Sequence, residues 1–277
     1  MPILVDATAQ ERKRLVELFP IAQIRENWPE IKGSKEEICF SIAETNDQHR
    51  ITAFVDGTAV CCKQHVYIFD IEEYRFPQTI IDGERLVATA DYALYVVRAT
   101  YSVVLKDPLE ETEISFLWPI HLSVQGKHLI VQFVVLEKNL ASYFERPCYT
   151  GQRSVDEDSV LKNIGADNLT KSDLHKGIKA LWAVGFMDTS RTRYKRPKSL
   201  DSVTMDEGLG IRENNPELYE TLQETPLLNT LFIVEDQECG VGAFLVDCTN
   251  GYVAFPQYSA RERGTDFVIQ EILKNNN

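Results

Sequence analysis

The chain has 277 residues, of which 44% are hydrophobic and 26% are charged, and this balance argues against a disordered chain. Its formal net charge is −13, which repels nucleic acid and anionic membranes unless the positive charges are gathered in one place. The length suits one large domain or two domains of ordinary size.

The sequence shows neither a membrane span nor an export signal. The longest apolar runs, such as residues 129–136, are far shorter than the roughly 20 residues that a spanning helix needs. The N-terminus reaches the charged run from Glu11 to Arg14 after only a few mixed residues, so it lacks the continuous apolar segment of a secretory signal. The six cysteines include no CxxC pair, and most lie in apolar runs, which favours reduced thiols. We therefore expect a cytoplasmic protein with no membrane contact and no cofactor or metal.

The first predicted element is a helix over about residues 8–18. Thr8 and Glu11 have the spacing of a capping box, and leucines follow at helical intervals.

Next, the sequence predicts a β-hairpin over residues 50–69 with its turn at Asp56 and Gly57. An Asp-Gly pair between β-branched runs is a strong signal for a two-residue turn.

Residues 86–105 fit two interpretations. Leu86, Ala90 and Leu94 have helical spacing, whereas Val96, Val97 and other β-branched residues suit a strand. A helix that gives way to extended chain near residue 100 is the preferred prediction, and a strand remains open.

A second hairpin is predicted over residues 114–136, with its turn at Gln125 and Gly126. One face of it is almost entirely apolar and is expected to form core. On the other face, this register places Ser123 opposite His128, with His121 nearby. Two histidines and a hydroxyl could bind a metal or begin a nucleophile and base arrangement, although the outer face of a ribbon is also the ordinary place for polar residues.

The second half of the sequence predicts helices and short strands. Helices are expected over about 170–184, after Pro216, and at the C-terminus behind a capping box formed by Ser259 and Glu262. Strands are expected at 228–234, 241–248 and 252–255.

These elements predict an α+β fold with an antiparallel, hairpin-rich N-terminal half that also carries helices, followed by a C-terminal half made of helices and a small sheet. Glycines, prolines and acidic residues cluster between 144 and 168, so a domain boundary is expected near residue 150. The predicted domains are 1–150 and 151–277.

The most unusual local feature is a basic segment that we predict to be a loop. It places five positive charges in eight residues and has no acidic residue between Thr189 and Leu200. Such a segment could hold phosphates while its tyrosine stacks on a base. The candidate binding residues are Arg191, Arg193, Tyr194, Lys195, Arg196 and Lys198. The alternative is that these charges are solvated or neutralised by acidic residues of the same chain.

Other motifs point to no defined chemistry. Cys61, Cys62 and His65 suggest zinc by composition, but neighbouring strand residues point to opposite faces and cannot easily share an ion. The acidic clusters flank turns, and motifs typical of phosphate-binding loops, dinucleotide sites, serine hydrolases and zinc proteases are missing from the sequence. The terminal helix begins near Arg261 and Arg263, and the free backbone N–H groups at its start could accept an anion.

Three functions follow from these observations. The preferred one is a non-catalytic binding or regulatory protein that contacts nucleic acid or an acidic protein through the basic segment. The second is a hydrolase, with a nuclease as one form, whose site assembles only in three dimensions. The third is an acidic inhibitor or immunity-type protein that covers a basic partner. The sequence leaves the oligomeric state open.

Overall fold

The computed structural model describes residues 3–58, 63–136, 139–196, 199–205, 209–236, 239–261 and 263–276. It confirms the α+β class, with helices and antiparallel strands. The chain forms two compact units. The first comprises Met1–Ala59, Glu73–Gln125 and Val131–Leu169, and the second comprises Val60–Glu72, Gly126–Ile130 and Thr170–Asn277.

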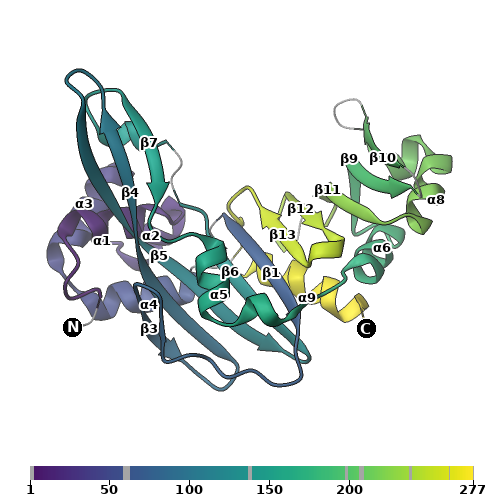
Figure 1. Ribbon diagram of the computed structural model, residues 1–277, viewed down its shortest axis with the longest axis horizontal. Helices are drawn as coiled ribbons and strands as arrows, with labels where there is room; N and C mark the ends of the chain where they lie inside the picture. The colour runs from purple at the N-terminus through teal and green to yellow at the C-terminus, as the bar shows by residue number, and fades with distance from the viewer. Residues whose placement is uncertain are drawn as a thin grey trace. The chain divides into compact units, whose positions relative to one another are not determined.

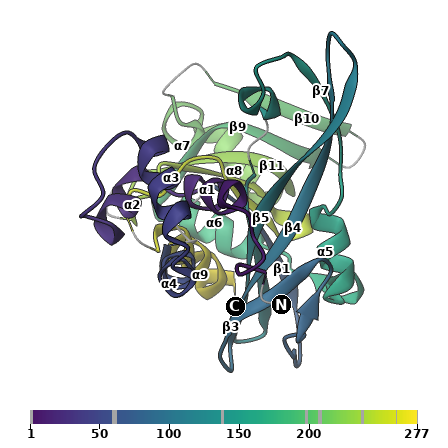
Figure 2. The same cartoon turned by 90° about the vertical axis from the view of Figure 1, so that its left-hand side faces the viewer.

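The first unit combines a group of N-terminal helices with long antiparallel strands (Figures 1 and 2). Its helices are α1 (Ala9–Glu17), α2 (Ile21–Asn27), α3 (Lys35–Thr45), α4 (Gln48–Thr58) and α5 (Glu157–Asn163). Its strands are β2 (Thr79–Ile80), β3 (Gly83–Ala88), β4 (Tyr92–Leu105), β5 (Glu110–Gln125) and β7 (Cys148–Arg153). They are ordered β5-β4-β3-β2, and β7 also pairs with β4. The described residues of this unit also form the 3-10 turns η2 (Leu140–Tyr143) and η3 (Ala166–Asn168).

The N-terminal helix forms as predicted. Thr8 caps α1, and its side chain and that of Glu11 each accept a hydrogen bond from the other's backbone N–H. The carboxylate of Glu11 also accepts a hydrogen bond at 2.7 Å from Nε of Arg98 on β4. This buried carboxylate therefore joins the start of the helix to the sheet of the first unit.

Two predicted elements of the first unit are wrong. Asp56 and Gly57 lie at the end of α4, not in a hairpin turn, and Ile51, Phe54 and Val55 are buried at helical spacing. Residues 92–105 form the strand β4, not a helix. Because residues 93–97 are all buried, β4 shows no simple alternation of polar and apolar residues that would have marked it as a strand.

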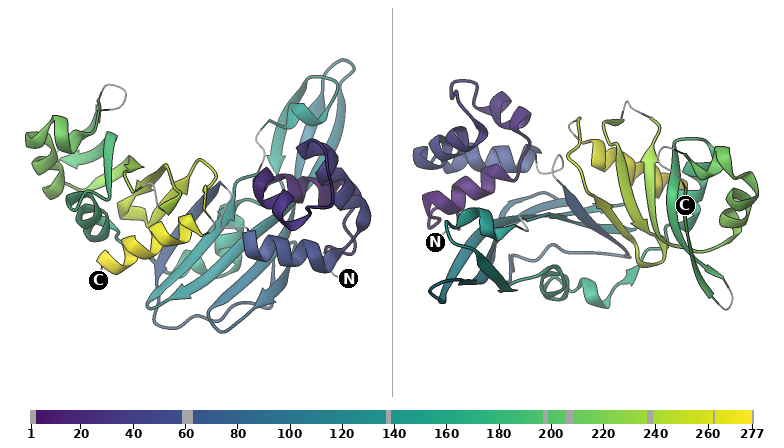
Figure 3. Two further views of the ribbon diagram at one scale, coloured as in Figure 1. Left: turned by 180° about the vertical axis from the view of Figure 1, so that it is seen from behind. Right: turned by 90° about the horizontal axis from the view of Figure 1, so that it is seen from above.

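The second unit is a sheet covered on one face by helices (Figures 1 and 3). Its strand order is β10-β9-β11-β12-β13-β1, and β8 also pairs with β1. The strands are β1 (Gln64–Asp70), β8 (Thr170–Lys171), β9 (Met187–Arg196), β10 (Ser199–Thr204), β11 (Leu227–Val234), β12 (Ala243–Asp247) and β13 (Tyr252–Phe255). The helices are α6 (His175–Ala183), α7 (Ile211–Asn214), α8 (Pro216–Glu224) and α9 (Gly264–Asn276), with a 3-10 turn η5 (Cys248–Asn250).

The core of the second unit lies between its sheet and its helices. Trp182 of α6 packs edge-on against Phe232 of β11, with ring centroids 5.5 Å apart, and Phe244 and Phe255 continue this aromatic row on the next strands. The helix predicted over 170–184 is confirmed from His175 onward as α6, whereas Thr170 and Lys171 form the strand β8. Gly185 follows α6 with a positive φ of 78°. By contrast, the terminal helix begins at Gly264, well after the predicted cap at Ser259.

The predicted second hairpin is confirmed, with a shifted turn. Strand β6 (His128–Val134) follows β5 after a turn at Gly126 and Lys127, one residue later than predicted. The opposition predicted for Ser123 and His128 therefore does not hold. His121 and His128 are both buried, so neither lies on an exposed outer face.

Replacing Gly177 with alanine should destabilise the protein by about 1–3 kcal/mol. A Cβ at this position would lie 2.2 Å from the carbonyl oxygen of Ile272, where α6 and α9 pack closely. The matched control is Gly57→Ala in α4, where a Cβ meets nothing within 4 Å. That change should be neutral or slightly stabilising, because alanine favours a helix over glycine. Urea unfolding of the two variants tests this, and equal stabilities would contradict it.

Candidate functional site

The basic segment is a strand, not the predicted loop. Residues of β9 pair with β10 on one side and with β11 on the other. The reason is visible in the sequence, because uncharged Thr192 and Tyr194 alternate with the basic residues at the two-residue period of a strand. The positive charges therefore lie on a rigid strand, β9.

This alternation divides the basic residues between two faces. Arg191, Arg193 and Lys195 are exposed, whereas Thr192 and Tyr194 are buried. The Tyr194 side chain is only 3% exposed, so its ring cannot stack on a base as predicted. We call Arg191, Arg193 and Lys195 the cationic stripe.

Arg196 lies with Tyr194 and not with the cationic stripe. Its Nε is 2.9 Å from a carboxylate oxygen of Asp201 on β10, and one of its terminal nitrogens donates to the Tyr194 hydroxyl at 3.2 Å. The intramolecular neutralisation considered from the sequence therefore applies to Arg196. Lys198 lies outside the described residues.

The cationic stripe itself has no acidic neighbour in register. Arg191 is flanked by Thr204 and Leu231, and Arg193 is flanked by Ser202 and Asn229. Over the ranges that the structure describes, none of the three stripe residues forms an ion pair. Successive stripe residues lie about 6.6–6.8 Å apart along the strand. The result is a row of accessible positive charges on a sheet face.

His121 belongs to a buried hydrogen-bonded chain in the first unit. The Tyr92 hydroxyl lies 2.8 Å from Nδ1 of His121 and 2.8 Å from a carboxylate oxygen of Asp56. The Tyr92 hydroxyl donates its single proton to Asp56, so its oxygen accepts a hydrogen bond from His121. Nδ1 of His121 therefore carries a proton. Nε2 of His121 is buried and lacks a hydrogen-bond partner in the described part of the chain. Burial lowers the pKa of His121 to about 4.

His128 lies in a second polar cluster, within the second unit. Its Nδ1 is 3.1 Å from a carboxylate oxygen of Asp70 and 3.2 Å from Oγ of Ser172. The Ser172 hydroxyl donates to the same carboxylate at 2.5 Å. Burial lowers the pKa of His128, against the attraction of Asp70. The cluster ties β1, β6 and the chain before α6 together.

The His128 cluster has the residue types of a hydrolase triad but a different arrangement. In a working triad, the serine and the carboxylate lie on opposite nitrogens of the imidazole ring, so that the ring can remove the serine proton. Here both oxygens approach Nδ1, and the serine proton is given to Asp70. Ser172 is also fully buried. This geometry suits a structural role and gives the hydrolase alternative no support at His128.

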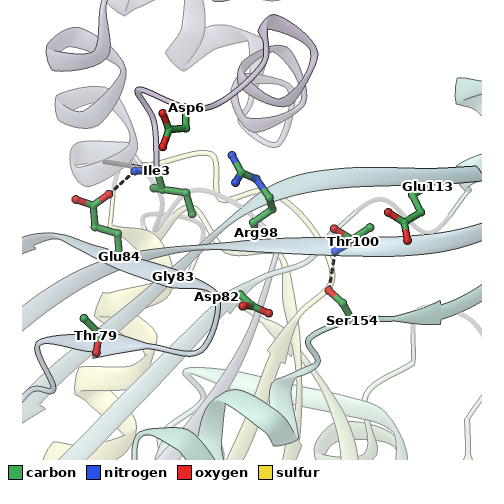
Figure 4. Close-up of a pocket in the computed structure, with 10 residues that line it drawn as sticks. All are labelled: Ile3, Asp6, Thr79, Asp82, Gly83, Glu84, Arg98, Thr100, Glu113 and Ser154. Carbon is green, nitrogen blue, oxygen red and sulfur yellow. Dashed lines mark hydrogen bonds between the residues drawn. The ribbon is translucent and has the colours of Figure 1, made fainter. Parts of the chain in front are cut away.

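The first unit contains a surface hollow of about 660 Å³ (Figure 4). Figure 4 shows Arg98 rising from β4 toward the segment that carries Ile3 and Asp6. Its acidic lining residues are Asp6, Asp82, Glu84 and Glu113. Glu84 accepts a hydrogen bond from the backbone N–H of Ile3, and Arg98 pairs with Glu11. The lining is negative overall, which suits a cation rather than the anionic partner that the sequence predicts.

Among the described residues, the fold places the remaining sequence motifs in no catalytic or metal-binding arrangement. Cys61 and Cys62 lie outside the described residues, and His65 packs edge-on against Tyr252. Among the described residues, no group of three or more His, Cys, Asp or Glu side chains is placed to hold a metal ion. Burial raises the pKa of the Cys39 thiol to about 12, which makes it a poor nucleophile. The Ser259 hydroxyl donates to the Arg261 carbonyl instead of capping α9.

No helix in the described part of the chain combines the length and apolar character needed to cross a bilayer. Comparison of the chain with protein-family models, with curated proteins and with solved structures found no match.

Sequence reasoning missed the partners of both histidines. Asp70 and Ser172 are separated by 102 residues, and Asp56 and Tyr92 by 36 residues, so only the fold brings them together. The cationic stripe, however, could have been found from the sequence. Strict alternation of basic and uncharged residues from Arg191 to Lys195 is the available signal.

Proposed function

We propose that the chain is a non-catalytic binding protein that holds an anionic partner on the cationic stripe. The observation that carries this proposal is the exposure of Arg191, Arg193 and Lys195 on one face of β9 without an ion pair among the described residues. A chain of net charge −13 repels a polyanion at long range, so contact requires such a concentrated local patch.

The neighbours of the cationic stripe leave its positive charge uncompensated. Its neighbours in register on β10 and β11 are uncharged, so no adjacent carboxylate cancels its potential. The strand fixes the backbone of all three residues, so that little backbone entropy is lost when an anion binds. The long arginine and lysine side chains remain free to reach phosphate or carboxylate oxygens.

The experiment measures polyanion binding across a range of salt concentrations. The probes are a fluorescein-labelled twelve-residue oligouridylate and labelled heparin, and the variant is Arg191→Gln, Arg193→Gln, Lys195→Gln. Removing three phosphate contacts should reduce the slope of log K against log salt by roughly 2 for the oligonucleotide.

The matched control removes three exposed lysines from elsewhere in the chain, by Lys162→Gln, Lys176→Gln and Lys274→Gln. It makes the same change in net charge and should keep the wild-type slope. Equal slopes and affinities for the wild type and the stripe variant would overturn the proposal.

A further inference from the structure

The cationic stripe shares its sheet face with a row of residues that crosses the whole second unit. The register pairs Arg191 with Leu231, Leu231 with Leu245, Leu245 with Ala254, and Ala254 with His65. Directly paired residues of antiparallel strands point to the same face of the sheet. The row therefore runs from β9 to β1 on one face.

Aromatic side chains lie at the far end of this face. Tyr252 of β13 pairs with Tyr67 of β1, and their ring centroids are 5.1 Å apart. His65 is the β1 member of the face row, two positions from Tyr67, and its ring centroid is 5.8 Å from that of Tyr252. All three side chains are partly exposed. We call His65, Tyr67 and Tyr252 the aromatic cluster.

The opposite face of the same strands is core. Val66, Phe232 and Phe244 alternate with the residues of the face row and are buried against the helices. Helices thus cover one face of the sheet, and cations and aromatics occupy the other. Three strand spacings separate β9 from β13, a distance of about 14 Å. This is a span that a few linked nucleotides can bridge.

We propose that this sheet face binds single-stranded nucleic acid, with phosphates on the cationic stripe and bases stacked on the aromatic cluster. The inference deepens the proposed function and rests on it. Cations combined with aromatic faces are the features by which proteins hold single strands, because every base has a face that can stack. An acidic protein partner would use the cations but gain little from the aromatic rings.

A carboxylate on the same face does not disturb this arrangement. Asp247 pairs in register with Tyr252, but its oxygens accept hydrogen bonds from the backbone N–H and the side-chain amide of Asn250. Its charge is thereby partly satisfied by the turn that follows β12. The stripe and the aromatic cluster therefore remain the features offered to a ligand.

The test uses the full chain with Tyr67→Val and Tyr252→Val, because valine keeps the strand preference while removing the stacking surface. Binding of the labelled oligouridylate should weaken about tenfold or more, whereas heparin, which has no bases, should bind as it does to the wild type. Tyr67→Phe with Tyr252→Phe is the matched control and should retain oligouridylate binding.

A second measurement uses only the wild-type chain. An oligonucleotide carrying 2-aminopurine should change its fluorescence at saturation, because the base leaves its neighbours and stacks on tyrosine. A duplex of the same length should bind at least tenfold more weakly than the single strand, since its bases are covered.

The outcomes separate the two proposals. Stripe-dependent binding of oligouridylate and heparin that the valine substitutions leave unchanged would overturn the nucleic-acid inference and keep the proposed function. An unchanged 2-aminopurine signal, or equal binding of the duplex, would also overturn it. Binding that does not depend on the stripe would overturn the proposed function itself.

Discussion

Lowering the pH from 7 to 4 should remove about 3 kcal/mol of folding free energy through His121 alone. Its pKa is about 4 in the folded protein, because burial disfavours the charged ring, and about 6.5 in the unfolded chain. Between these values the unfolded state binds a proton that the folded state does not bind. Stability is therefore complete above about pH 6.5 and falls as the pH drops toward 4.

Urea unfolding at a series of pH values measures this effect. The difference between the wild type and His121→Gln isolates His121 from the carboxylates that titrate in the same range. The exposed His49 provides the control, because His49→Gln should keep the pH dependence of the wild type. If His121→Gln lost stability with acid as steeply as the wild type, the neutral buried state assigned to His121 would be wrong.

Replacing Glu11 with alanine should lower the free energy of unfolding by about 3 kcal/mol. The carboxylate of Glu11 is buried, and it serves both the cap of α1 and the ion pair with Arg98. Its removal leaves the Thr8 N–H without its acceptor and leaves a partly buried guanidinium without its counter-ion. Both losses carry a desolvation cost.

Two further variants divide this effect. Glu11→Gln keeps an oxygen that can accept from Thr8 but removes the charge that pairs with Arg98, so it should fall between the wild type and Glu11→Ala. Glu36→Ala removes an exposed partner of Lys13 and should cost less than about 1 kcal/mol. Equal losses for Glu11→Ala and Glu36→Ala, measured by urea unfolding, would show that α1 is not anchored through Glu11.

Local signals predicted the elements whose cause is local. The cap at Thr8, the turn glycine at Gly126 and the helix stop at Gly185 depend on residues within a few positions, and all three appear in the structure. The apolar face of the second hairpin was also predictable, because one register places its large side chains together.

Elements whose surroundings decide their conformation were not predictable. Asp56 and Gly57 carry a turn signal, yet Asp47 accepts a hydrogen bond from the Arg50 N–H and begins a helix that runs through them. The apolar run of β4 is buried on both faces, which hides its strand period. In both places, tertiary packing outweighs the local preference.

The candidate site was likewise predictable only where local signals decide the structure. The density of positive charge was visible in the sequence, but its interpretation as a loop assigned Tyr194 and Arg196 to the same surface as the stripe. The strand places Tyr194 in the core and Arg196 beside Asp201. The link from Arg191 to His65 depends on four successive strand registers, which no local pattern reveals.

An anionic ligand bound on the exposed face of β9 would be detected by backbone amide resonances recorded while the protein is titrated with the oligouridylate. We expect the largest shifts on Arg191, Arg193 and Lys195 and on their neighbours in β10 and β11, followed by Tyr67 and Tyr252. Saturable shifts confined to other parts of the chain, with β9 unchanged, would contradict it.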